Sequence, residues 1–162
     1  MFVTITEFKS RLKIRARFVE LLKVHLVIKP LQIVFKKYSN KQLKVLESKD
    51  RGTVGKDLSQ ILKENQLTII PRFEDHDLKH LILGYGMTSM EEIRMQAYLF
   101  GNGNWSPFCL VFLATGLIFP EEWKSFYAEF KKGRTGPNIL HLRVVDCMDE
   151  STEEMIRRYR RV

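Results

Sequence analysis

Hydrophobic residues recur at helical spacing along most of the chain. Between positions 6 and 28 there is neither Gly nor Pro, and apolar residues return every three or four positions, as on one face of a helix. That face would consist of Leu12, Ala16, Val19, Leu22 and Leu26. Pro30 follows and marks a break. The pattern therefore predicts a long amphipathic helix near the start of the sequence.

Three later segments carry helix start and stop signals. Thr53 is suited to cap a helix that follows it, and Ser151 and Glu154 have the spacing of a capping box. Between them, a helix is predicted to begin at Pro120 and to end at Gly133. Its aromatic stripe would consist of Trp123, Phe126, Tyr127 and Phe130. Because strand signals are scarce, we predict an all-α fold, a compact single-domain helical bundle.

One continuous apolar stretch, PFCLVFLATGLIFP at 107–120, differs from these amphipathic segments. It contains Gly116, lies between Pro107 and Pro120, and is shorter than the roughly 20 residues that span a bilayer. We expect it to form a buried helix or a pair of buried strands. No segment shows the charged start, apolar middle and small-residue cleavage site of a secretory signal, so we expect an intracellular protein.

The composition agrees with one soluble domain over residues 1–162, because 44% of the residues are hydrophobic and 28% are charged. The two cysteines, Cys109 and Cys147, have no neighbouring Cys or His at metal-ligand spacing. We interpret them as buried free thiols. His25 and His141 also stand alone and are expected to be structural or exposed.

The net charge of +8 is confined to the first third of the chain. Residues 1–50 hold 12 Lys or Arg and 4 acidic residues, whereas residues 51–162 hold 15 of each. The basic residues around the first predicted helix are Arg11, Lys13, Arg15, Arg17 and Lys23. This helix suits an anionic membrane surface, and equally a solvated helix packed on the core. With few aromatics and no binding motif in this segment, we expect no nucleic-acid partner.

The stretch EDHDLKHLILGYGMTSMEEI at 74–93 has the spacing of a metal site. On a helix over 74–83, His76, Asp77 and His80 fall within an arc of about 100°, with the histidines one turn apart. Two imidazoles at this spacing converge on one ion, and a carboxylate beside them supplies a further ligand or orients a histidine. The helix would therefore present three candidate ligands on one side.

Glu92 can join this group only if the chain reverses after the first helix. On an unbroken helix, Glu92 would lie about 18 Å from His80, because it comes twelve residues later. Gly84 and Gly86 are suited to the reversal, because glycine readily adopts positive φ angles. Thr88 or Ser89 can then cap a second helix that carries Glu92.

The same residues can also be explained without a metal. Ser89 and Glu92, or Thr88 and Glu91, form capping boxes, and Asp75 or Asp77 would stabilise a helix N-terminus. A carboxylate-bridged di-iron bundle is excluded because the chain has no Glu-x-x-His unit.

An HD-type phosphohydrolase is an alternative metal enzyme, because His25, His76, Asp77 and Asp146 occur in the required order. His25 lies in the basic helix, however, and Asp146 lies in LRVVDCMD, which we interpret as strand-like or irregular. We therefore disfavour this class.

The motif resembles the H-D-x-x-H-x11-E signature of the Coq-four family of coenzyme Q biosynthesis proteins. The likeness extends over about residues 50–140, since GTVGKDLSQILKEN resembles that family's helix entry and FKKGR its later basic element. Glu91 stands where the family usually has Gly, a downstream Glu is replaced around Phe100, and GNGN at 101–104 replaces a more apolar connection. The chain therefore resembles a divergent member.

This resemblance implies a peripheral membrane protein that binds a polyprenylated aromatic precursor of ubiquinone and a divalent metal. The metal would be zinc, with iron or manganese as alternatives, held by His76, His80 and Glu92, while Asp77 is a fourth ligand or orients a histidine. The family is associated with oxidative removal of the ring carboxylate and with organising the other biosynthetic enzymes. A non-catalytic lipid-binding scaffold is therefore the alternative function.

The resemblance also suggests where the partners would bind. The prenyl tail needs an apolar lining, for which the candidates are Leu81, Ile82, Phe100, Leu110, Phe112 and Leu113. The expected partners are the prenylated precursor, the membrane surface and other quinone-biosynthesis proteins. A homodimer stays open, because the aromatic stripe at 120–130 suits a core or a subunit contact. The location would be the bacterial cytoplasmic face or the mitochondrial inner membrane.

Overall fold

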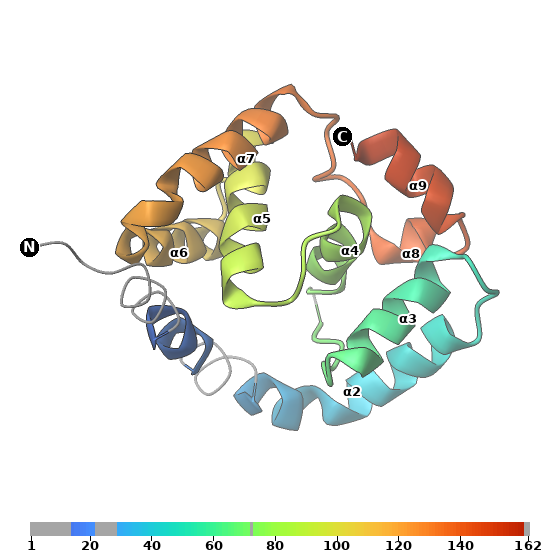
Figure 1. Cartoon of the computed structure of the whole chain (residues 1–162). Helices are drawn as coiled ribbons and strands as arrows, with labels where there is room; N and C mark the ends of the chain where they lie inside the picture. Colours follow the sequence, from blue (N-terminus) through green and yellow to red (C-terminus); the bar gives the residue numbers. More distant parts are fainter. Residues whose placement is uncertain (1–13, 22–28, 72, 161–162) are drawn as a thin grey trace, which may run out of the picture.

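The computed structural model describes residues 14–21, 29–71 and 73–160, and every regular element in these ranges is a helix (Figure 1). Residues 14–21 are helical, and the elements that follow are α2 (Lys29–Glu47), α3 (Val54–Glu64), α4 (Glu74–Leu83), α5 (Ser89–Gly101), α6 (Pro107–Thr115), the 3-10 turns η2 (Gly116–Ile118) and η3 (Pro120–Glu122), α7 (Trp123–Thr135), α8 (Val144–Cys147) and α9 (Thr152–Tyr159). The predicted all-α, single-domain bundle is confirmed.

Helix α4 lies at the centre of the fold, between α5 on one side and α3, α8 and α9 on the other (Figure 1). Leu78 and Ile82 of α4 are fully buried in the main core, a cluster to which α2, α3, α5, α8 and α9 also contribute. A second cluster consists of Val19, Ile93, Ala97, Phe119 and Phe126. Helix α5 contributes to both clusters, so it connects the two halves of the core.

Most of the predicted helix starts are confirmed by capping hydrogen bonds. The hydroxyl of Thr53 accepts from the backbone N–H of Lys56, and that of Ser151 accepts from the N–H of Glu154. The segment after Pro120 begins with the 3-10 turn η3, and α7 starts only at Trp123. Its first turn therefore has tighter geometry than the sequence suggested.

Gly133 does not end its helix, contrary to the prediction. Helix α7 continues to Thr135, and Gly133 lies where α7 meets α5. A Cβ atom at Gly133 would overlap the carbonyl group of Tyr98, and one at Gly101 would overlap that of Phe130. The two glycines thus let the backbones of α5 and α7 approach closely.

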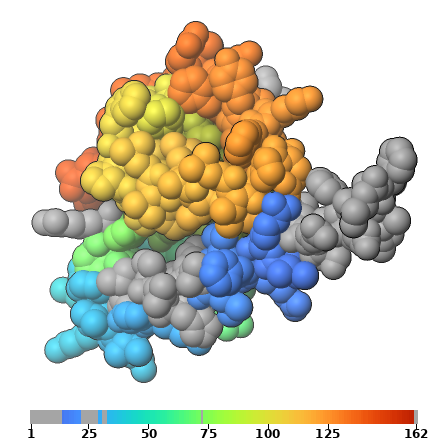
Figure 2. Space-filling view, turned by 90° about the vertical axis from the view of Figure 1, so that its left-hand side faces the viewer, coloured from blue at the N-terminus to red at the C-terminus, as the bar shows by residue number. Residues whose placement is uncertain are grey.

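The apolar stretch at 107–120 is helical, but only Cys109, Gly116 and Phe119 are buried, so the expectation of a buried element was wrong. Within α6 only Cys109 is buried, whereas Leu110 and Val111 are 44% and 63% exposed. Leu117 and Ile118 of η2 extend this surface. In Figure 2 the yellow and orange face of α6 and its following turns lies beside the blue segment 14–21. We call the exposed residues Leu110, Val111, Leu117 and Ile118 the apolar face.

The described part of the first predicted helix packs against the body of the protein. Val19 is buried in the second cluster, and the carboxylate of Glu20 accepts hydrogen bonds from the backbone N–H and hydroxyl of Ser89. Arg15 donates to the carbonyl of Ile118 at 2.7 Å and pairs with Glu121. Arg17 is exposed. The other residues of that predicted helix, Leu12, Leu22, Leu26, Arg11, Lys13, Lys23 and His25, lie outside the described residues.

No helix among the described residues is both long enough and apolar enough to cross a membrane.

Replacing Gly133 with Ala should destabilise the protein strongly. The added Cβ meets the backbone of Tyr98, which cannot move without shifting α5, so we expect a loss of at least about 2 kcal/mol in the free energy of unfolding. Gly86→Ala is the matched control, because a Cβ at Gly86 would be at an ordinary 3.5 Å from the Glu91 side chain. Urea unfolding of the three proteins measures this, and equal stabilities for Gly133→Ala and wild type would contradict the close approach.

Candidate metal centre

Helix α4 places His76 and His80 side by side at the centre of the fold. The helix runs from Glu74 to Leu83 as predicted, and its two imidazole rings have centroids 5.0 Å apart. His80 is only 3% exposed, whereas His76 is partly accessible. The predicted spacing is therefore confirmed, and one histidine of the pair faces towards solvent more than the other.

The predicted reversal is also confirmed. Gly84 caps α4 with a left-handed φ of 78°, and the Thr88 hydroxyl caps α5 by accepting from the N–H of Glu91. Gly86 does not take a positive φ, so a single glycine suffices for the turn. The hydroxyl of Tyr85 donates to the Glu129 carboxylate of α7 at 2.5 Å, which ties the turn to the next helix.

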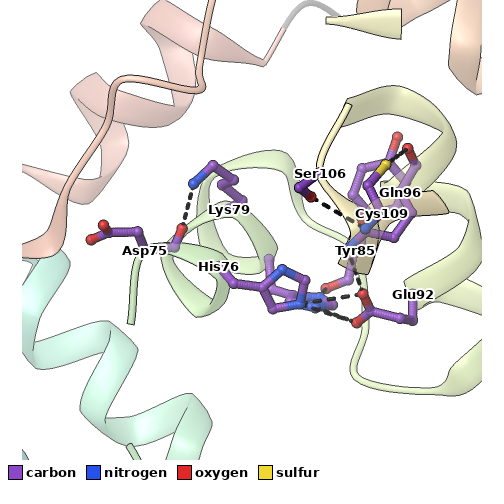
Figure 3. A network of polar contacts seen from close by, with 9 residues as sticks. Asp75, His76, Lys79, Tyr85, Glu92, Gln96, Ser106 and Cys109 are labelled. Atoms are coloured by element: carbon purple, nitrogen blue, oxygen red, sulfur yellow. Dashed lines mark hydrogen bonds and ion pairs between the residues drawn. The ribbon is translucent and has the colours of Figure 1, made fainter. Parts of the chain in front are cut away.

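Glu92, in the first turn of α5, is thereby directed at both histidines (Figure 3). Its Oε2 atom lies 3.0 Å from Nε2 of His80 and 3.3 Å from Nε2 of His76. One ligand atom from each of the three residues lies within 4.8 Å of the others. Of the four predicted ligands, the structure brings these three together.

The protonation of His80 is constrained on both sides of its ring. Nδ1 of His80 lies 3.2 Å from the backbone carbonyl of Tyr85, which can only accept, so Nδ1 carries a hydrogen. In a neutral ring Nε2 is then an unprotonated acceptor, and it faces a carboxylate oxygen of Glu92 at 3.0 Å. Two acceptors at this distance need a cation between them, which is either a proton on Nε2 or a metal ion.

The charges of the metal-free site follow from this arrangement. Burial alone would raise the pKa of Glu92, but His76 and His80 outweigh it and hold that pKa well below the usual range. Burial alone would lower the pKa of His80, but Glu92, Asp77 and the Tyr85 carbonyl raise it above the ordinary value. Without a metal, the buried pair of His80 and Glu92 is therefore an ion pair that holds one proton.

Asp77 lies beside this group without belonging to it. Burial raises the pKa of Asp77 to about 6, although the neighbouring His76 and His80 act in the opposite direction. Within the described part of the chain its carboxylate makes no hydrogen bond, either to a histidine or to another group. Its predicted role as fourth ligand or orienting residue stays a prediction.

Gln96, Phe73 and Phe108 lie around the site but were missed in the sequence, whereas Phe112 was predicted as a tail-lining residue. The Gln96 amide donates to Oε1 of Glu92 at 2.8 Å, one helical turn further along α5. Phe73, Phe108 and Phe112 form what we call the aromatic wall: Phe108 packs edge-on against Phe73 and His76, at centroid distances of 5.2 and 5.5 Å, and lies 4.7 Å from Phe112. Gln96 could have been found from its i+4 spacing to Glu92, whereas the wall depends on tertiary packing.

The donor set fits a divalent metal. Two imidazole nitrogens and one carboxylate oxygen are the ligands of many catalytic zinc sites, which keep a further position open for water or substrate. The same atoms also suit iron or manganese, so this donor set does not select one of the three metals. Since the Tyr85 carbonyl fixes the hydrogen on Nδ1, the Nε2 lone pair of His80 is available for such an ion.

The six predicted tail-lining residues lie in different surroundings. Leu81 and Ile82 are buried in the main core, and Leu113 packs against the second cluster. Phe100 contacts Trp105 and Phe130, Leu110 belongs to the apolar face, and Phe112 is part of the aromatic wall. Among the described residues, Phe112 is the predicted lining residue whose ring contacts Phe108, which in turn contacts the candidate ligand His76. The lining as a whole stays a prediction.

The remaining candidates lie elsewhere. Asp146 is exposed in the short helix α8, so the strand-like interpretation of its segment was wrong. Cys109 and Cys147 are free and buried as predicted, and burial raises the pKa of each thiol to about 11. His141 is exposed and contacts the ring of Tyr159.

Comparison with known proteins gives a likeness in structure alone. No protein-family model matches the sequence, and no curated protein matches it. The fold is similar to the crystal structure of a protein from Nostoc punctiforme PCC 73102 that is named a "putative ubiquinone biosynthesis protein". The TM-score is 0.55 at 17% sequence identity, over 94% of this chain and 90% of that chain. This likeness shows a shared fold over nearly the whole length of both chains.

The ion pair predicts an unusual pH dependence for the metal-free protein. Because the folded pKa of His80 is raised, its stabilising contribution is complete below about pH 6.5 and is lost as the pH rises through the raised value. The size of this loss therefore reports how strongly Glu92 holds the proton on His80. Thermal unfolding of chelator-treated protein between pH 5 and 9 measures it.

The control for this pH dependence is Glu92→Gln, which keeps the shape of the side chain and removes its charge. The loss of stability above about pH 6.5 should be much smaller in this variant, because the raised pKa of His80 depends on Glu92. Parallel profiles of stability against pH for wild type and Glu92→Gln would show that the pair of His80 and Glu92 contributes nothing to stability.

Proposed function

We propose that this chain is a metal-dependent protein of ubiquinone biosynthesis that binds a prenylated aromatic precursor. The observation that carries the proposal is the convergence of Nε2 of His76, Nε2 of His80 and a Glu92 oxygen within 4.8 Å, in a place where a cation is required. The fold shared with the Nostoc punctiforme protein gives this site its biosynthetic context.

The ligand residues would be His76, His80 and Glu92, with zinc as the favoured ion and Asp77 as the neighbouring carboxylate. A bound divalent ion supplies Lewis-acid polarisation for a phenolate or carboxylate of the substrate ring. Zinc has no redox chemistry, so an oxidative loss of the ring carboxylate would need iron or manganese with molecular oxygen, or a partner enzyme. The contribution of the protein is to hold the ligands, to fix the His80 tautomer and to limit access by water.

The aromatic wall supports an aromatic substrate at this site. Phe108 packs edge-on against His76, the more accessible of the two histidines, so a ring that approaches the ion from this side meets apolar edges and faces. Aromatic pairs of this kind contribute about 0.5–1.5 kcal/mol beyond their buried area. An aromatic head group bound to the ion would therefore gain from Phe108 as well.

The apolar face supports a second candidate, the non-catalytic scaffold. The segment 110–118 contains no charged residue. It exposes the four apolar side chains of this face, Leu110, Val111, Leu117 and Ile118. A surface of this kind suits a membrane or another biosynthetic protein. In a scaffold the ion would serve only to join α4 to α5, and the protein alone would not convert a ring substrate.

Metal content separates the proposed site from a purely structural arrangement of two capped helices. We expect wild-type protein loaded with Zn²⁺, Fe²⁺ or Mn²⁺ to retain about one ion per chain by elemental analysis, and His80→Ala and Glu92→Gln to bind more than about 100-fold more weakly. His141→Ala is the control, because His141 is exposed and lies outside the site. Wild type without affinity for any of the three ions would refute the metal centre.

A soluble hydroxybenzoate tests the substrate class with the metal-loaded protein. Binding by calorimetry should require the metal and should weaken by about 2- to 12-fold in Phe108→Ala, the loss that corresponds to one aromatic contact. Tyr127→Ala is the control for an aromatic residue elsewhere, since Tyr127 is 58% exposed on α7. Equal binding with and without metal would contradict the proposed function, and conversion of the ring analogue by pure protein would exclude the scaffold.

A further inference from the structure

Gln96 is the most completely enclosed polar residue near the candidate site. Its exposure is 0%, and its Nε2 donates to Oε1 of Glu92 at 2.8 Å (Figure 3). Its own carbonyl oxygen is buried and has no hydrogen-bond partner among the described residues. A buried amide that leaves one polar atom unpaired costs stability, typically about 1–3 kcal/mol. An apolar residue at this position would avoid the cost, so the residue needs a reason other than packing.

The reason lies in the two oxygens of Glu92. Both oxygens lie 3.3 Å from Nε2 of His76, but Oε2 also lies 3.0 Å from Nε2 of His80, whereas Oε1 receives the Gln96 amide. Without that hydrogen bond the carboxylate could rotate about its last bond and present either oxygen, or both, to an ion.

We propose that Gln96 is a positioning residue that fixes the rotation of the Glu92 carboxylate, so that Oε2 faces His80 and the same oxygen is presented to an ion at the site. The inference deepens the proposed function and rests on it, since it concerns the same metal centre. Gln96 does not touch the ion or the substrate in this arrangement. It acts through Oε1 of Glu92, which accepts the hydrogen bond from its amide.

The test is the metal affinity and the coordination of Gln96→Met, which keeps the length of the side chain and removes both polar atoms. We expect the dissociation constant for Zn²⁺ to rise by about 10- to 100-fold, as for other residues that orient metal ligands. Loading with Co²⁺ gives the second readout, because its visible absorption reports coordination number and geometry. The spectrum of the variant should change, whereas a merely structural role for Gln96 would leave it as in wild type.

Met95→Leu is the matched control, since Met95 is also fully buried in α5 but packs in the main core. This variant should keep the Zn²⁺ affinity and the Co²⁺ absorption spectrum of the wild type. Gln96→Leu provides a second variant in case Gln96→Met does not fold, with the same expected losses.

A measurement on the wild type itself is independent of any variant. The side-chain amide protons of Gln96 should be protected from hydrogen exchange in NMR spectra, and should stay protected when Zn²⁺ binds. Rapid exchange in the zinc-bound protein would show that Gln96 does not donate to Glu92 when the metal is bound, which would contradict the proposed positioning role.

The possible failures can be told apart. If wild type binds no metal, the proposed function fails and this inference fails with it. If wild type binds metal and His80→Ala does not, while Gln96→Met matches wild type in affinity and Co²⁺ spectrum, the metal centre stands and the positioning role of Gln96 is refuted.

Discussion

The buried carboxylate of Glu92 is the constraint around which the centre of this protein is arranged. A buried negative charge is costly unless it is paired and hydrogen-bonded, and Glu92 has three side-chain partners on two helices. His76 and His80 come from α4, and Gln96 comes from the next turn of α5. For α4 and α5 to meet in this way the chain must reverse within a few residues, which Gly84 makes possible with its left-handed backbone. The position of one charged group thus determines the geometry of two helices and the turn between them.

Helix α5 transmits this constraint to the rest of the fold. Glu92 lies next to Ile93, which is fully buried in the second cluster, and Met95 on the same helix is fully buried in the main core. Further along, the close approach at Gly101 and Gly133 fixes α7 against α5. Tyr85 adds a direct link, since its carbonyl faces His80 while its hydroxyl donates to Glu129 of α7. The candidate metal ligands, the turn and both parts of the core are therefore coupled through short contacts.

The features that sequence could predict are those determined by local geometry. The placement of His76 and His80 on one face follows from the helical period, and the need for a reversal before Glu92 follows from helix length. Phe108 could not be found in this way, because it approaches α4 from α6, a different part of the chain. Gly133 shows the limit of a local signal, since the same residue type ends helices and permits close packing, and only the position of α5 decides between the two. Likewise, the run at 107–120 indicates a need for an apolar partner, but not that Cys109 would be the only buried residue of α6.

The contact between His80 and Glu92 also explains why this arrangement favours a cation. With Nδ1 committed to the Tyr85 carbonyl, a neutral His80 has only its Nε2 lone pair to present to the Glu92 oxygen 3.0 Å away. A proton between these atoms satisfies them at the cost of a buried ion pair, and a divalent ion satisfies them together with His76. The proton and the metal ion compete for the same atoms, Nε2 of His80 and an oxygen of Glu92. At low pH the proton on His80 stabilises the metal-free fold, and when that proton leaves, the same atoms become available to a metal. A carboxylate and two histidines arranged for helix capping alone would not need this geometry, because none of them would have to face another acceptor.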